Sequence, residues 1–143
     1  MASRREEVIQ AVVDLVKAAL PDAEVKRDAP WPSRSEPGGL VIVRDGDPGE
    51  PEDCFSPRAF TYRHEIPVEV FAPEAVADRH KALDDMITAL GAAIEANRAL
   101  GGLCDWLEGV APSPEDIASS ASQPVRAALV PLMAEYTTSN PLA

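Results

Sequence analysis

Aromatic residues make up only 5% of this 143-residue chain, so few large side chains are available for a hydrophobic core. The core must therefore be built mainly from Ala, Val, Leu and Ile. A chain of this length can bury roughly two thirds of its unfolded surface in one core, without disulfides or metals. The sequence predicts a single domain, 1–143, with an aliphatic core.

Basic residues are also scarce, with 13 Lys and Arg against 24 Asp and Glu, a formal net charge of -11. Because affinity for nucleic acids comes largely from Lys and Arg at the phosphates, this balance argues against tight DNA or RNA binding. No apolar run reaches the ~18 residues of a membrane-spanning helix, and the N-terminus has no signal-peptide-like segment. We expect a soluble protein that is not exported by that route and has no membrane partner.

Residues that carry chemistry are few and isolated. Cys54 and Cys104 lie in no paired spacing, which indicates a reduced, intracellular environment. His64 and His80 have no Cys or His at ligand spacing, so we interpret His64 as a half-buried packing residue and His80 as part of a helical stripe. There is no phosphate-binding glycine loop and no Gly-x-Ser-x-Gly motif. The sequence predicts no enzyme activity, no cofactor and no metal site.

Two amphipathic helices are predicted, over 3–20 and from Pro73 to about Asn97, because apolar residues recur there at helical spacing. Ser3, followed three residues later by Glu6, predicts a capping box at the start of the first helix. Strands are expected over 23–27, 40–43, 60–70, 104–108 and 125–138. No βαβ unit repeats, so we expect an α+β fold, a mostly antiparallel or mixed β-sheet with two α-helices on one face.

Prolines interrupt the two longest predicted strands, at Pro67 and Pro131. Proline donates no ladder hydrogen bond, so each is expected at a sheet edge or a bulge. Long loops are predicted at about 44–59 and 110–124. The first is expected to be exposed and mobile. The two carboxylates of Asp45-Gly46-Asp47, in the first loop, could hold a hard cation. No calcium-binding loop pattern follows them, which favours a turn with solvated carboxylates.

Several local patterns are familiar in combination. They are the Asp45-Gly46-Asp47 turn after a hydrophobic strand, the alternating Tyr62-Arg63-His64, the helical Leu83-Asp84, Leu100-Gly101-Gly102-Leu103-Cys104-Asp105-Trp106-Leu107-Glu108, and the ending Tyr136-Thr137-Thr138-Ser139-Asn140-Pro141-Leu142. Together they span nearly the whole chain and resemble the tail terminator proteins of long-tailed phages, prophages and phage-like gene transfer agents.

The resemblance implies a structural subunit that assembles into a hexameric ring in the bacterial cytoplasm and ends up in the particle tail. Such a ring caps the tail tube, fixes tail length and offers its other face to a head completion or connector protein. It implies no catalytic residues. DNA would pass through without specific binding, and an acidic lumen wall would repel its phosphates.

The two long loops are the expected contact segments with other subunits or partners. Their acidic candidates are Asp45, Asp47, Glu50, Glu52, Asp53, Glu115 and Asp116. Two alternatives stay open from the sequence. The chain could be another neck or tail completion subunit, or a small ligand-binding domain or enzyme.

Overall fold

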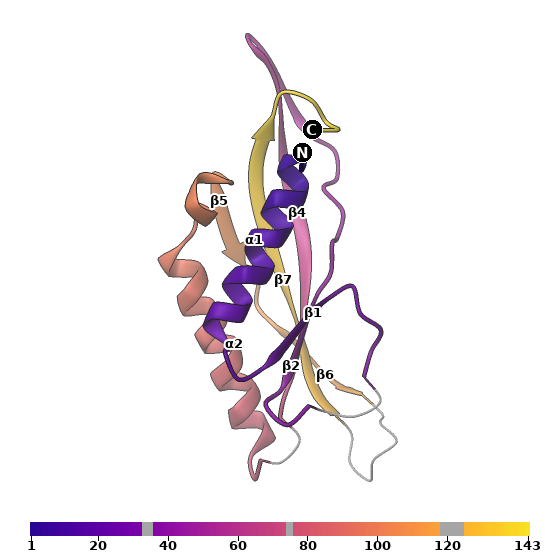
Figure 1. Ribbon diagram of the computed structural model, residues 1–143, viewed down its shortest axis with the longest axis vertical. Coiled ribbons are helices and arrows are strands. Elements are labelled where there is room, and N and C mark those ends of the chain that lie inside the picture. Colours follow the sequence, from indigo (N-terminus) through magenta and orange to yellow (C-terminus); the bar gives the residue numbers. More distant parts are fainter. Residues whose placement is uncertain (33–35, 74–75, 118–124) are drawn as a thin grey trace.

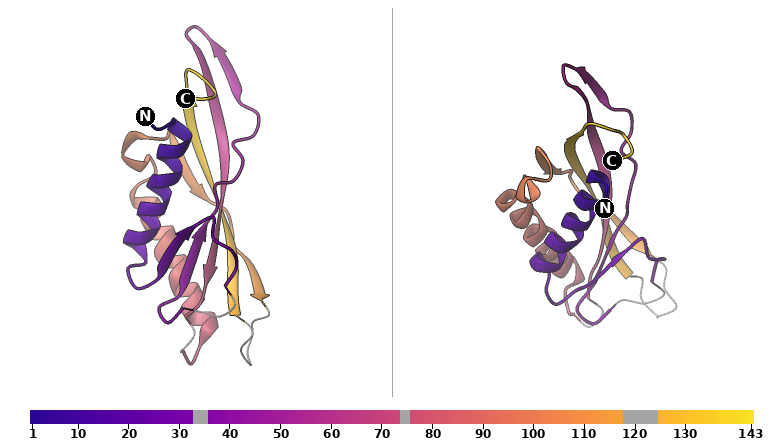
Figure 2. Two further views of the ribbon diagram at one scale, coloured as in Figure 1. Left: turned by 45° about the vertical axis from the view of Figure 1, so that its right-hand side comes forward. Right: turned by 45° about the horizontal axis from the view of Figure 1, so that its top comes forward.

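The computed structural model describes residues 1–32, 36–73, 76–117 and 125–143, which form two α-helices and a seven-stranded mixed sheet (Figure 1). Both helices cover the same face of the sheet (Figure 2). This confirms the expected α+β fold. The elements are α1 (Arg4–Ala19), β1 (Glu24–Arg27), β2 (Leu40–Val43), β3 (Glu52–Phe55), β4 (Arg58–Phe71), α2 (Arg79–Ala96), a 3-10 turn (Leu100–Gly102), β5 (Trp106–Gly109), β6 (Ser113–Ile117) and β7 (Val125–Thr138).

Side-chain caps set where the helices begin. The Ser3 hydroxyl accepts a hydrogen bond from the Glu6 N–H at 3.2 Å, and α1 begins at the next residue as expected. The second helix begins at Arg79, later than the expected Pro73, because the Asp78 side chain caps it by accepting from the Lys81 N–H at 3.1 Å. The predicted start lay too far upstream because it was taken from Pro73 and the apolar spacing, and not from the capping residue Asp78.

Strands β4 and β7 form the spine of the sheet, pairing antiparallel from Phe60 opposite Thr138 to Phe71 opposite Ala127. The sheet order is β1-β2-β4-β7-β5, with β3 added to β4 and β6 added to β7. Only β1 and β2 pair in parallel among the described strands. The alternation predicted for 60–70 is confirmed, because its apolar face is buried throughout. That face consists of Phe60, Tyr62, His64, Ile66, Val68 and Val70.

The two prolines lie opposite each other in the middle of the spine, so the expected edge position is wrong. The expected bulge is confirmed, because the register of the flanking strand slips by one residue beside each proline, between Val43 and Asp47 and between Gly109 and Ser113. The Pro67 carbonyl accepts from the Arg44 N–H at 2.9 Å, and the Pro131 carbonyl accepts from the Val110 N–H at 2.8 Å. Both prolines therefore turn their backbone polar groups away from the β4–β7 ladder. Each proline lacks the N–H that would return the second bond of this pair, and the regular ladder of β2 and of β5 ends there.

The two predicted loops each contain a strand that the sequence did not reveal. Residues Glu52–Phe55 form β3, which pairs with the start of β4, and Ser113–Ile117 form β6, which pairs with β7. Residues 118–124 of the second loop lie outside the described residues. The loop assignments 44–59 and 110–124 are therefore only partly correct, because the backbone hydrogen bonds of a neighbouring strand overrode a composition poor in β-forming residues.

A second, smaller core lies on the sheet face that carries no helix. Leu40, Ile42, Phe71 and Ala127 are all at most 2% exposed there, and Ala29 packs against them from the segment that follows β1. The Trp31 indole on the same segment donates to Glu69 of β4. The segment after β1 thus covers part of the helix-free face. The remaining apolar residues form the main core beneath the helices.

Candidate interaction surface

A charged cluster joins α1, β1 and the turn after β2. The Arg27 guanidinium binds both carboxylate oxygens of Glu6, each at 2.7 Å, and its Nε lies 2.6 Å from Asp45 Oδ1. The Asp28 side chain accepts from the Asp45 N–H at 3.2 Å. Bidentate guanidinium–carboxylate pairing fixes both the distance and the orientation of the groups. The cluster therefore holds three parts of the chain together.

His64 lies directly behind this cluster and is fully buried, which corrects the expected half-buried position. Its Nε2 is 2.6 Å from the Asp45 carbonyl oxygen, and its Nδ1 is 2.9 Å from the Tyr136 hydroxyl. A carbonyl oxygen can only accept, so Nε2 carries the proton and the Tyr136 hydroxyl donates to Nδ1. The neutral imidazole thus satisfies both partners and connects the turn after β2 to β4 and β7.

The Asp45-Gly46-Asp47 turn approaches β4 closely. Gly46 has a φ of 69°, and a Cβ there would lie 1.9 Å from the Glu65 carbonyl oxygen. The backbone of Asp47 forms an isolated antiparallel β-bridge with that of Glu65. The Asp47 carboxylate accepts a hydrogen bond from the Gly49 N–H at 2.9 Å. This turn requires glycine for both its backbone angle and its space. Its carboxylates serve an ion pair and a local turn.

Hydrogen bonding and burial shift the pKa values of the cluster and of the His64–Tyr136 pair beside it. Hydrogen bonds from Arg27 lower the pKa of the Glu6 and Asp45 carboxyls. Burial lowers the pKa of His64 and raises the pKa of Tyr136 to about 12. Because each acid and the histidine hold their protons less tightly in the folded protein, the unfolded chain binds more protons as the pH falls.

We expect stability to fall in two stages on acidification. The His64 contribution is complete above its unfolded pKa of about 6.5 and is lost as the pH falls below that value and through the lower pKa of the folded protein. The Glu6 and Asp45 contributions follow below about pH 4.5. Urea unfolding of the wild type and of His64→Gln between neutral and acidic pH should show that the variant lacks the loss of stability at the higher pH. His80→Gln, which changes the exposed second histidine, should still show that loss.

The acidic residues expected to form contacts divide into two groups at opposite ends of the spine. Glu52 and Asp53 are exposed beside the Phe60 end, and Glu50, just before them in the chain, is exposed as well. Asp47 is exposed opposite Glu65, nearer the middle of the spine, and Asp45 is engaged by Arg27. Glu115 and Asp116 lie on β6, with backbones opposite Ala127 and Arg126, at the Phe71 end. Eleven residue steps of a strand separate the ends by roughly 35 Å. The structure therefore does not bring the two groups together.

The first group leads into a projecting hairpin, which we call the arm: β3 and the start of β4, residues 52–61. All four β3 residues are exposed, and the arm extends beyond both chain ends at the top of Figure 1. Its tip residue Phe55 is 70% exposed. The Arg58 guanidinium lies 5.2 Å from the Phe55 ring centre and 5.0 Å from that of Phe60. Sequence reasoning missed this arm, although the turn residues Ser56-Pro57 between two strand-forming aromatics were an available signal.

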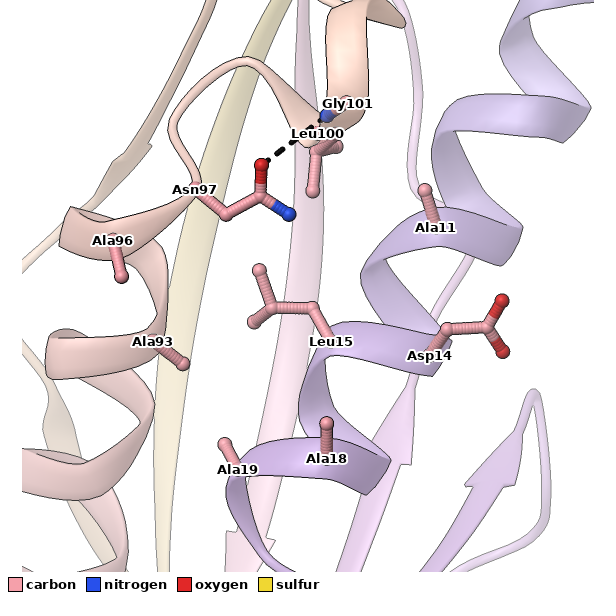
Figure 3. Close-up of a pocket in the computed structure, with 10 residues that line it drawn as sticks. All are labelled: Ala11, Asp14, Leu15, Ala18, Ala19, Ala93, Ala96, Asn97, Leu100 and Gly101. Carbon is pink, nitrogen blue, oxygen red and sulfur yellow. Dashed lines mark hydrogen bonds between the residues drawn. The ribbon is translucent and has the colours of Figure 1, made fainter.

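A groove of about 560 Å³ runs between α1 and α2 (Figure 3). Its base is apolar, because Leu15 and Leu100 are buried there. Asp14 lines the α1 side, with its carboxylate pointing outward, away from α2. Small side chains keep the helices from filling the space between them. The small lining residues are Ala11, Ala18, Ala19, Ala93, Ala96 and Gly101.

Neither metal ligands nor a membrane span is found in the parts of the chain that the structure describes. No group of three or more His, Cys, Asp or Glu side chains there is arranged to hold a metal ion. No helix among the same residues has the length and hydropathy needed to cross a bilayer. A scan against protein-family models and a search of curated proteins both find no match.

Proposed function

We propose that this protein is a structural assembly subunit of the tail terminator type. In this role, copies of the chain form a hexameric ring that caps the tail tube, fixes tail length and provides the surface for joining the head. The observation that carries the proposal is the arm, with Phe55 70% exposed at its tip. The resemblance in sequence supplies the kind of particle.

The arm is better suited to contact with another molecule than to stabilising its own subunit. Its strand β3 buries none of its side chains and pairs, among the described strands, with β4 alone. An exposed strand edge can pair with or pack against another chain, and exposed aromatic side chains are enriched at interfaces. A projecting hairpin with both features is a contact element.

Two separate contact regions also suit a subunit that meets different partners on its two sides. The arm with its acidic neighbours and strand β6 with Glu115 and Asp116 lie at opposite ends of the spine. We propose that one end serves the tail tube protein and the other the head completion or connector protein. The charged residues of the Arg27 cluster are paired with one another, which supports a role for that cluster in holding the subunit together.

The net charge of -11 fits a ring around DNA. Phosphates are repelled by carboxylates, so an acidic lumen lets a duplex pass without being retained. We propose that DNA passes through the ring without specific binding.

Deleting the gene from its host is the decisive experiment, read by electron microscopy of the particles. We expect overlong tails, because nothing would stop tube growth at the correct length. Complementation with the intact gene should restore the length. Tails of normal length left unjoined to heads would identify another neck or tail completion subunit, and normal, joined particles would contradict both assignments.

A further inference from the structure

We propose that the arm tip of one subunit docks into the α1–α2 groove of a neighbouring copy of this chain. Phe55 fills the alanine-lined hollow, and Arg58 pairs with Asp14 at its rim. The inference rests on the proposed ring, for which it names the contact between subunits. It assigns a specific partner surface to the two features that the isolated subunit leaves unused.

The shapes of the two surfaces are complementary. The groove has a volume of about 560 Å³, and small side chains on both helices border it, so its apolar base is open to a planar ring (Figure 3). Phe55 is the most exposed aromatic side chain among the described residues, at 70%, and it stands at the end of a projection. Aromatic side chains are enriched at the buried cores of protein interfaces, where they fill pockets on the partner.

The charges are complementary as well. Arg58 lies against the Phe55 ring, so one apolar surface and one positive charge are presented together at the tip. Asp14 lines the α1 side of the groove and is exposed; in Figure 3 its carboxylate points outward, away from α2, and it accepts a hydrogen bond from the Gln10 amide at 3.1 Å. In a chain with a net charge of -11, a basic tip has few repulsive partners on a second copy, and the pairing with Asp14 sets its orientation.

The occupant must come from a second copy because the arm cannot reach its own groove. The arm continues the long strand β4 and extends past the start of α1, whereas the groove lies between the two helices beside the body of the sheet (Figures 1 and 2). The contact therefore joins two different patches on two subunits. Such heterologous contacts repeat from subunit to subunit and close into a ring when the rotation allows it.

Self-association of the purified full-length chain tests the docking, measured by sedimentation and light scattering over a range of concentrations. We expect the wild type to associate, and Phe55→Ala and Arg58→Asp each to weaken association by about tenfold or more. Asp14→Arg alone should weaken it similarly. Combining Arg58→Asp with Asp14→Arg should restore it, because the charge pair is re-formed in reverse. Trp106→Ala removes another exposed aromatic and should have no effect.

Several outcomes would overturn the docking. These are association that is unaffected by Phe55→Ala and Arg58→Asp, failure of the double charge reversal to restore association, or a wild-type chain that remains monomeric at every concentration. Circular dichroism and urea unfolding show that each variant is folded. None of these results decides the proposed function, because tail length in the gene-deleted host measures that separately.

Discussion

Replacing Phe71 with alanine is expected to lower the free energy of unfolding by about 3–5 kcal/mol, the range for truncating a buried aromatic. Phe71 is fully buried on the helix-free face, where it packs with Leu40 and Ile42. The cover over this small core includes Ala29, from a segment with little secondary structure. Leu40 and Ile42 are held by the pairing of β2 with β1 and β4, so they cannot move far into the space that the ring leaves, and the cavity term should be large. Urea unfolding at neutral pH measures the loss.

The chain offers a matched control in Phe55, since both residues lose the same atoms on substitution. Phe55 is 70% exposed, so Phe55→Ala should change stability by less than about 0.5 kcal/mol. If Phe71→Ala lowered the free energy of unfolding by less than about 1.5 kcal/mol, the residues on the helix-free face would not form a true core. The point matters for function, because a buried core there leaves less of that face available to partners.

The main fold could be predicted from the sequence wherever one face of an element is buried. Alternation along 60–70 identified the buried face of β4, and helical spacing with the Ser3 cap identified α1. In these segments the side-chain pattern directly reports which atoms leave water. The hydrophobic period of these segments agreed with the burial of their side chains, because both reflect packing of one face against the main core.

The strands that the sequence did not reveal are the ones that bury little. Strand β3 has an acidic, fully exposed sequence, so no hydrophobic period marks it, and it forms because β4 supplies hydrogen-bond partners. The central positions of Pro67 and Pro131 in the sheet were missed for a related reason. Their tolerance depends on where the flanking strands end, which is a property of the assembled sheet.

The charged cluster depends on contacts between distant parts of the sequence. Arg27 is 21 residues from Glu6 and 18 from Asp45, and no local rule pairs them. His64 has no Cys or His at ligand spacing in the sequence, and the sequence could not show the two hydrogen-bond partners that make its full burial possible. The arm and the groove became recognisable as surfaces only once the fold had placed them.

Replacing His64 with leucine is expected to cost about 2–4 kcal/mol, because a buried hydroxyl and a buried carbonyl each lose a hydrogen-bond partner. The partners are the Tyr136 hydroxyl and the Asp45 carbonyl oxygen. His64→Gln keeps a side-chain amide that can donate to Asp45, so it should cost less than His64→Leu. Urea unfolding above pH 7, where the wild-type imidazole is neutral, compares the three proteins.

His64→Leu also tests whether the two hydrogen bonds of His64 act as a connected network. Tyr136→Phe removes only the hydroxyl, so its cost combined with His64→Leu should fall short of the sum of the two single costs. Fully additive costs, or a His64→Leu protein as stable as the wild type, would contradict the network.

The network connects the spine to the turn whose Asp45 binds Arg27, and Arg27 in turn binds Glu6 of α1. Loss of the network should therefore also loosen the α1 wall of the α1–α2 groove. Association of His64→Leu should therefore weaken at temperatures where the variant is still mostly folded, while His64→Gln remains closer to the wild type.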